Sequence, residues 1–382
     1  MYFRSNRKEV IKKARRIVIK IGSAVLAGDL HSGVDESLFS NLAKDISHII
    51  KDKRKVILVS SGAIAIGMKR LGLKEKVKSI PEKQAVAAVG QGSLMALYEK
   101  VFSPLKIRVA QVLLTHDDLS DRHRFLNAKN TLQTLLEYNA IPIINENDTV
   151  AVDEIKFGDN DNLSALLTNL VEADLLVILT DINGLYNKDP KINKDAELIP
   201  VVDDIDKFIS VAGRTLGIYG TGGMQTKLDA AKKAAHFGVP TIVANGREKN
   251  ILKKIFSGND IGTLFLPMEE RLTSRKHWLA FSTRPAGSLI LDDGAKNALL
   301  KKGKSLLSSG IIGIEGNFDS GDAVSCVSPN GKEIARGIVN YSSDELKKIK
   351  GLKTSEIEKA LGYKYFDEVI HRDNLVIQER EP

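Results

Sequence analysis

The stretch Arg16-Ile17-Val18-Ile19-Lys20-Ile21-Gly22-Ser23 joins a charged start, a run of β-branched apolar residues and a Gly-Ser turn. Such a run predicts a short strand that is buried on both faces. Lys20 comes near its end, so its ammonium group is expected at the carboxyl edge of a sheet, where ligands of open α/β sheets bind. The lysine therefore indicates a site for a charged anion such as a nucleotide phosphate. A buried strand with a surface lysine would also fit, so the remaining motifs must decide.

Strand-like runs alternate with amphipathic segments between residue 16 and about residue 266. The runs cover residues 17–21, 56–60, 109–114, 141–145, 175–180 and 241–244. The segments between them cover residues 36–51, 81–102, 127–138, 163–171 and 224–237. This alternation predicts a doubly wound α/β fold, in which helices cover both faces of a mostly parallel sheet.

The pattern changes near Pro267, where short strand-like runs, frequent glycines and turn motifs such as Asp292-Asp293-Gly294 begin. These features predict a small β-rich domain, and residues 342–361 return to a helical, charged pattern. We therefore expect an α/β domain over residues 1–266, a linker over 267–274, and a β-rich domain with a C-terminal helical tail over 275–382.

Composition bounds the class of protein. The length of 382 residues favours two or three domains, and the single cysteine, Cys326, excludes an internal disulfide and fits the cytoplasm. No apolar run reaches the length of a membrane span, and the basic N-terminus lacks the pattern of a signal peptide. The net charge of +8 permits nucleic-acid binding, but residues 271–382 carry 18 Lys and Arg against 15 Asp and Glu. Charge alone therefore does not identify the partner.

Polar clusters follow several of the predicted strands. Ser60-Ser61-Gly62-Ala63 comes between a strand and a helix, where small residues let backbone N–H groups approach an anion. Asn145-Glu146-Asn147-Asp148 ends another strand, and Phe157-Gly158-Asp159-Asn160-Asp161-Asn162 precedes a helix. A tight turn would explain the first cluster and helix capping would explain Asp161 or Asn162. Two dense polar clusters at strand ends nevertheless indicate a site for a polar, zwitterionic small molecule.

Two further motifs favour a nucleotide. Thr180 and Asp181 end a strand at a position suited to a base or ribose, and the turn Asn183-Gly184 follows. The glycine-rich loop of residues 217–227 precedes a helix whose first turn contains Lys227. It matches neither the Walker A pattern nor a dinucleotide fingerprint, yet it combines free amides, a helix dipole and an ammonium group. The histidines and the cysteine show no metal-ligand spacing, so no protein metal site is expected.

In order and spacing, these motifs resemble the amino acid kinase family, and specifically its glutamate-phosphorylating branch. The C-terminal motif Gly316-Asn317-Phe318-Asp319-Ser320-Gly321-Asp322-Ala323-Val324, followed by Ile334-Ala335-Arg336-Gly337, resembles a PUA domain. The resemblance implies transfer of the ATP γ-phosphoryl group to the side-chain carboxylate of L-glutamate, which gives L-glutamyl 5-phosphate, the first step of proline biosynthesis. It also implies Mg²⁺ with the nucleotide, feedback inhibition by proline and a homo-oligomer, either a dimer or a tetramer.

The resemblance also assigns roles to residues. Lys20 and Lys227 would approach the transferring phosphoryl group from two sides, and Asp161 would hold both ammonium groups by ion pairing. The residues expected to bind the amino acid are Ser60, Gly62 and Ala63 at the reacting carboxylate and Asp148 and Asn160 at the α-amino group. The residues expected to bind the nucleotide are Lys20, Thr180, Asp181, Thr221, Gly222, Gly223, Met224, Gln225, Thr226 and Lys227.

Two alternatives remain open. Acetylglutamate, aspartate, carbamate and uridylate kinases share the fold and the first lysine, and a family member acting on another carboxylate would show many of the same motifs. The chain could instead be an RNA-binding or regulatory protein that acts through its PUA-like domain. The modest charge of that domain and its lack of a clear aromatic stacking platform argue against RNA binding as the main function.

Overall fold

The computed structural model describes residues 2–26, 35–75, 77–151, 160–190, 192–205, 222–267, 285–364 and 366–378. The chain divides into two compact units, Met1–Arg271 and Leu272–Pro382, which are described separately below. The linker predicted over residues 267–274 lies, apart from Pro267, outside the described residues.

An eight-stranded, mostly parallel sheet forms the centre of the first unit, in the order β3-β4-β2-β1-β5-β7-β8-β6. Its strands are β1 (Arg16–Ile21), β2 (Lys55–Ser60), β3 (Arg108–Leu114), β4 (Ala140–Glu146), β5 (Leu175–Thr180), β6 (Val201–Val202), β7 (Thr241–Asn245) and β8 (Thr263–Phe265). Among the described strands of this sheet, β7 and β8 pair in antiparallel fashion and the other pairs are parallel. The α/β prediction is confirmed, and the six predicted strands are present. The short strands β6 and β8 were not predicted, because two or three residues carry too little pattern to be recognised.

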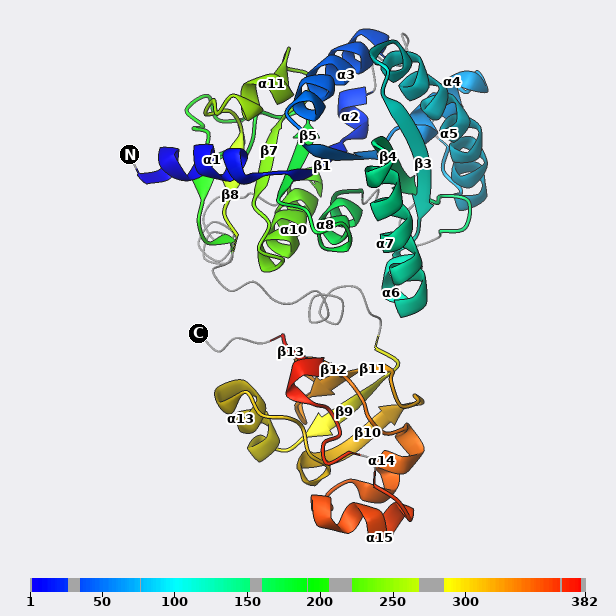
Figure 1. Cartoon of the computed structure of the whole chain (residues 1–382), viewed down its shortest axis with the longest axis vertical. Coiled ribbons are helices and arrows are strands. Elements are labelled where there is room, and N and C mark those ends of the chain that lie inside the picture. Colours follow the sequence, from blue (N-terminus) through cyan, green and yellow to red (C-terminus); the bar gives the residue numbers. More distant parts are fainter. Residues whose placement is uncertain are drawn as a thin grey trace. The chain divides into compact units, whose positions relative to one another are not determined.

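Helices lie on both faces of this sheet (Figure 1). They are α1 (Tyr2–Lys13), α2 (Ser23–Leu26), α3 (Glu36–Lys51), α4 (Ala63–Arg70), α5 (Ile80–Phe102), α6 (His116–Ser120), α7 (Arg122–Glu137), α8 (Asn160–Leu170), α10 (Gly222–His236) and α11 (Ile251–Phe256). Local sequence fixes several of their starts. The Asp35 carboxylate accepts from the N–H groups of Ser37 and Leu38 at the start of α3, and Ser79 and Glu82 form a capping box at the start of α5.

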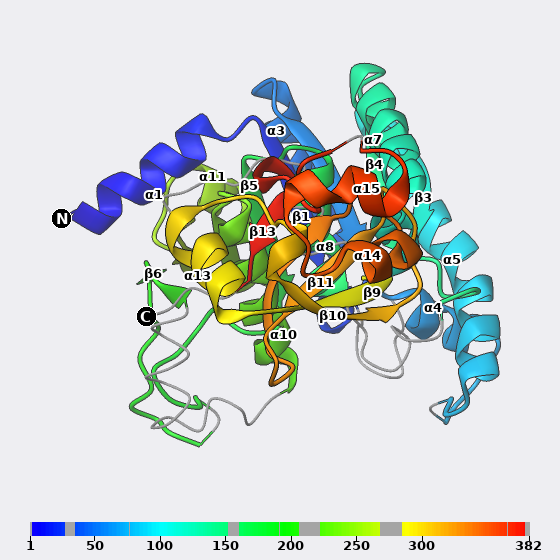
Figure 2. The same cartoon turned by 90° about the horizontal axis from the view of Figure 1, so that it is seen from below.

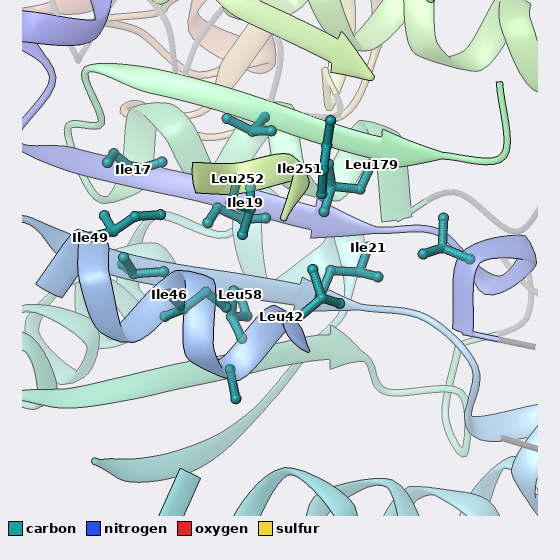
Figure 3. Close-up of a cluster of buried hydrophobic side chains, with 14 of the residues drawn as sticks. Ile17, Ile19, Ile21, Leu42, Ile46, Ile49, Leu58, Leu179, Ile251 and Leu252 are labelled. Atoms are coloured by element: carbon teal, nitrogen blue, oxygen red, sulfur yellow. The ribbon is translucent and has the colours of Figure 1, made fainter. Parts of the chain in front are cut away.

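The alternation of side chains along β1 decides which residues reach the core and which reach the site. Ile17, Ile19 and Ile21 are fully buried in one cluster with side chains of α3 and α11 (Figure 3). Since successive side chains of a strand point to opposite faces, Lys20 points to the other face, where it meets α8. The same strand therefore anchors the core with its odd-numbered residues and supplies an ammonium group with Lys20.

Helices α4 and α5 lie side by side and cross at two glycines (Figure 2). A Cβ atom on Gly90 would lie 1.8 Å from the carbonyl oxygen of Ala63, and one on Gly67 would lie 1.9 Å from that of Val86. Only glycine permits this approach, because any side chain would overlap the neighbouring backbone. The crossing brings the middle of α5 against the start of α4, directly beside the Ser60–Ala63 motif.

The N-terminal helix packs against the rest of the first unit through Ile11, which belongs to the hydrophobic core, and through the buried side chain of Arg7. Arg7 is only 2% exposed, and its guanidinium donates to the carbonyl oxygens of Ile261 at 2.5 Å, Pro200 at 3.0 Å and Gly262 at 3.2 Å. These carbonyls belong to the segments that lead into β6 and β8. The residues before the first strand, which the sequence motifs left unexplained, thus fasten the edge of the sheet at β6 and β8.

The second unit contains a five-stranded sheet in the order β10-β9-β11-β12-β13 and has its own hydrophobic core. Its elements are β9 (Gly287–Leu291), α13 (Asp293–Lys302), β10 (Ile311–Gly316), β11 (Ala323–Val327), β12 (Glu333–Ile338), α14 (Ser343–Ile349), α15 (Ile357–Leu361) and β13 (Leu375–Ile377). This arrangement confirms the predicted small β-rich domain. Cys326 is a buried, free thiol in β11, and burial raises its pKa to about 12. Within the described ranges, no helix has both the length and the hydropathy needed to cross a membrane.

Candidate active site

Three charged side chains from three elements meet at the carboxyl edge of the first sheet. Asp161, in the first turn of α8, lies between Lys20 of β1 and Lys227 of α10. The Lys20 Nζ atom is 2.6 Å from Asp161 Oδ1, and the Lys227 Nζ atom is 3.1 Å from Asp161 Oδ2. The side chains of all three residues are at least 90% buried. The structure thus brings together the three residues that the sequence predicted to be catalytic.

The charges in this Lys20–Asp161–Lys227 triad do not cancel. Burial alone would raise the pKa of Asp161, but the two neighbouring ammonium groups outweigh that effect and lower its pKa below the ordinary value. Asp161 therefore stays ionised, and the triad carries two positive charges against one negative charge. An excess positive charge is costly inside a protein unless an anion compensates it. The triad is consequently suited to bind a phosphate-bearing ligand.

Neighbouring groups hold the triad in place. The Thr226 hydroxyl donates to Asp161 Oδ2 at 2.8 Å, and Lys227 donates to the carbonyl oxygen of Gly223 one turn earlier in α10 at 2.7 Å. Gly22 follows β1 and donates its N–H to the carbonyl oxygen of Leu179 on β5. A Cβ atom at Gly22 would lie 3.2 Å from that oxygen, so a small residue is favoured beside the Lys20 ammonium.

The first polar cluster lies next to this triad. Asn160, at the start of α8, donates through Nδ2 to Ser61 Oγ and to Asn145 Oδ1, both at 2.9 Å. Gly62 adopts a left-handed conformation with φ of 106° and precedes α4, which begins at Ala63. Because glycine has no side chain to cap the helix, the first N–H groups of α4 can serve an external anion.

The described residues that were predicted to bind the nucleotide, apart from Lys20, lie at the end of β5 and at the start of α10. Thr180 donates its hydroxyl to Asp181 Oδ1 at 3.1 Å, and its carbonyl oxygen accepts from Gly246 after β7. Gly222 and Gly223 begin α10, followed by the buried Met224 and by Gln225, whose amide donates to Asp229 at 3.0 Å.

The remaining predicted residues lie in the turn after β4 or outside the described ranges. Asp148 lies half-buried in the turn after β4. Thr221 and the Phe157-Gly158-Asp159 part of the second polar cluster lie outside the described residues. Among the described residues, no three His, Cys, Asp or Glu side chains are placed to hold a metal ion.

Two polar residues of α5 were missed by the sequence reasoning. Tyr98 is 2% exposed and its hydroxyl lies 2.7 Å from Ser60 Oγ, while Gln91 Oε1 accepts from Asn145 Nδ2 at 2.9 Å. Burial raises the pKa of the Tyr98 phenol, so it stays protonated. The two residues are seven positions apart and share one face of a helix whose middle is mostly apolar. That spacing of polar residues was the available signal.

Comparison with known proteins identifies the chain. The model described as "Amino acid kinase family" matches residues 15–245, and the model described as "PUA domain" matches residues 287–361. The chain therefore belongs to the amino acid kinase family. A carbamate kinase from Giardia lamblia bound to AMP-PNP shares the fold, with a TM-score of 0.51 at 16% identity over 67% of this chain and 99% of that one.

Curated relatives narrow the family further. A protein of Geobacter sulfurreducens named glutamate 5-kinase is 55% identical over 97% of this chain and its own entire length. A glutamate 5-kinase of Syntrophus aciditrophicus is 52% identical over 98% of this chain and 97% of its own. Within its family, the chain is thus a member of the glutamate 5-kinases that carry a C-terminal PUA domain, as its motifs predicted.

Proposed function

We propose that this chain phosphorylates the side-chain carboxylate of L-glutamate with ATP to give L-glutamyl 5-phosphate, the first step of proline biosynthesis. The observation that carries this proposal is the Lys20–Asp161–Lys227 triad, a buried group with one excess positive charge at the carboxyl edge of an α/β sheet. The relatives named glutamate 5-kinase, which match nearly the whole chain, support the choice of substrate.

The chemical step needs no general base. A glutamate side chain has a pKa of about 4.3, so the nucleophile is already an anion at neutral pH. One of its oxygens bonds to the γ-phosphorus of ATP while the bond from that phosphorus to the bridging oxygen breaks, and ADP leaves with the electron pair. Catalysis then depends on alignment and on neutralising the charge of the phosphoryl oxygens. Lys20 and Lys227 are proposed to supply that charge, and Asp161 to hold them apart and oriented.

The polar cluster is proposed to align the amino acid. Backbone N–H groups around Gly62 and Ala63, with Ser60, would bind the reacting carboxylate at the open start of α4. Asn160 and Asp148 would hold the α-ammonium group. Support for Asn160 comes from its geometry, because both hydrogens of its Nδ2 are used by Ser61 and Asn145 and its oxygen remains as an acceptor.

The nucleotide is proposed to bind across the ends of β5 and α10. Thr180 and Asp181 would contact the nucleoside, and residues 221–227 would contact the phosphates together with Lys20. We propose that Mg²⁺ enters with ATP, because the described residues gather no carboxylate or imidazole cluster to hold it. When bound, the ion screens the charge of the phosphate oxygens.

A hydroxylamine trap tests the reaction and the substrate together. The full chain is incubated with magnesium ATP, hydroxylamine and one amino acid at a time, and the acyl hydroxamate is measured. We expect product with glutamate and none with aspartate or N-acetylglutamate. Product with either of the other two and none with glutamate would reject the proposed substrate, and no product with any of them would reject the reaction.

The family resemblance and the sequence pattern also support proposals about assembly, inhibition, domain boundaries and RNA. We propose a cytoplasmic homo-oligomer, a dimer or a tetramer, that proline inhibits; sedimentation and the hydroxamate assay with added proline test these points. We also propose the domain boundaries given above, 1–266 and 275–382, which deletion of residues from 271 onward tests, since the kinase unit should stay folded. RNA is proposed only as an accessory partner of the PUA domain, to be tested by filter binding of structured RNA to the intact chain.

A further inference from the structure

Helix α5 places the polar side chain of Gln91 against Asn145, which in turn contacts Asn160 at the site. The close approach of Gly90 to the Ala63 carbonyl brings this turn of α5 against the start of α4. Gln91, the next residue, is only 9% exposed although it lies in a mostly apolar helix. A buried amide is costly unless it is hydrogen-bonded, so its partners indicate why it is there.

Three buried amides form a chain from α5 to the site. Gln91 Oε1 accepts from Asn145 Nδ2 at 2.9 Å, and Asn145 Oδ1 accepts from Asn160 Nδ2 at 2.9 Å. The second hydrogen of Asn160 Nδ2 goes to Ser61 Oγ, also at 2.9 Å. The amides are therefore aligned head to tail, with each NH₂ group directed at the oxygen of its neighbour.

The row of three amides ends in an acceptor at Asn160 and in a donor at Gln91. Among the described residues, the buried Asn160 Oδ1 atom has no hydrogen-bond partner, and neither has Gln91 Nε2. An unpartnered oxygen beside the site suits a ligand that donates hydrogen bonds, such as an α-ammonium group. If the Asn145 amide turned over, its NH₂ group would face the NH₂ group of Asn160, and Asn160 would have to turn over as well. Asn160 would then present a donor to the ammonium group.

We propose that Gln91 is a positioning residue for the amino-acid substrate, because it fixes the Asn145 amide and thereby keeps the Asn160 oxygen directed at the α-ammonium group. This inference rests on the proposed function, since it takes glutamate as the ligand. It assigns Gln91 no contact with the substrate. Its effect is therefore confined to amino-acid binding and should pass entirely through Asn145.

The test is a double-mutant cycle on the full chain, with glutamate varied at saturating magnesium ATP. Gln91→Met keeps the length of the side chain and removes the acceptor, and we expect it to raise the KM for glutamate by about tenfold, or about 1.4 kcal/mol. The kcat and the KM for ATP should stay within about twofold. In an Asn145→Ala background, Gln91→Met should not change the KM for glutamate further, because the hydrogen bonds that connect Gln91 to Asn160 are already lost. Gln133→Met, an exposed site on α7, is the matched control and should leave all constants unchanged.

Each outcome decides the point. The proposal would be overturned if Gln91→Met left the KM for glutamate unchanged or lowered kcat instead. It would also be overturned if Gln91→Met raised the KM for glutamate a further tenfold in the Asn145→Ala background, because Gln91 would then contact the substrate itself through Nε2. Should Gln91→Met fail to fold, Gln91→Glu keeps an acceptor oxygen toward Asn145 and should hold the glutamate KM within about threefold; a tenfold rise there would also overturn it. Wild-type hydroxamate formation with glutamate is measured first, so a failure of the proposed function is recognised separately.

Discussion

Replacing Lys227 with methionine removes one charge from the triad and nearly preserves the length of the side chain. Lys20 would remain 2.6 Å from Asp161, so the charges would cancel and the excess positive charge would be lost. At about 4 Å from a phosphoryl oxygen and an effective dielectric constant of about 20, one ammonium group stabilises a unit negative charge by about 4 kcal/mol. If that interaction develops mainly in the transition state, its loss lowers kcat by about 10³-fold.

The assay is steady-state hydroxamate formation with both substrates saturating, alongside thermal unfolding. We expect Lys227→Met to fold, because Asp161 keeps one ion pair and the Thr226 hydrogen bond. Lys44→Met, at an exposed position on α3, is the matched control and should retain the wild-type kcat. A fall in kcat of less than about tenfold, or a rise in the KM for ATP alone, would refute the reasoning, since Lys227 would then serve only to bind the nucleotide.

Three further predictions concern packing, hydrogen bonding and pH. Gly90→Ala places a Cβ atom 1.8 Å from the Ala63 oxygen and should cost about 1–3 kcal/mol or more of unfolding free energy. Gly92→Ala lies two residues away, with no described atom within 4 Å of the added Cβ, and should raise the unfolding free energy by about 0.5–1 kcal/mol. If urea unfolding showed that both variants change the unfolding free energy in the same direction, the packing argument would be contradicted. Tyr98→Phe removes the hydroxyl that lies 2.7 Å from Ser60 Oγ and leaves Ser60 its bond to the carbonyl oxygen of Ser61, so it should cost about 0.5–1.5 kcal/mol in the same measurement. Wild-type stability would show that the bond between Tyr98 and Ser60 contributes nothing. Asp161 has a lowered pKa, so its ionised form stabilises the fold above its unfolded pKa of about 3.9, and that contribution is lost as the pH falls through the lower folded value. The stability difference between wild type and Asp161→Asn should therefore be constant above about pH 4 and shrink below it, and a difference that grew in acid would have the wrong sign.

The sequence by itself determined the elements whose signal is local. The continuous apolar runs of β1, β2 and β5 predicted buried parallel strands, because a strand covered on both faces needs apolar residues at every position. The position of Lys20 near the end of this run placed its ammonium group at the carboxyl edge of the sheet. The resemblance of the motifs to the amino acid kinase family then implied Asp161 and Lys227 as its companions.

Only the tertiary structure decided how other elements complete the site. The antiparallel pairing of β7 with β8 and the attachment of α1 through Arg7 join segments that no local pattern relates. Gln91 reaches Asn145 across 54 residues of sequence, and it does so because two glycines let α5 approach α4. A polar residue on an apolar helix signals that it needs a partner, but the partner is chosen by packing. Hydrogen bonds between distant segments depend on positions that exist only once the chain has folded.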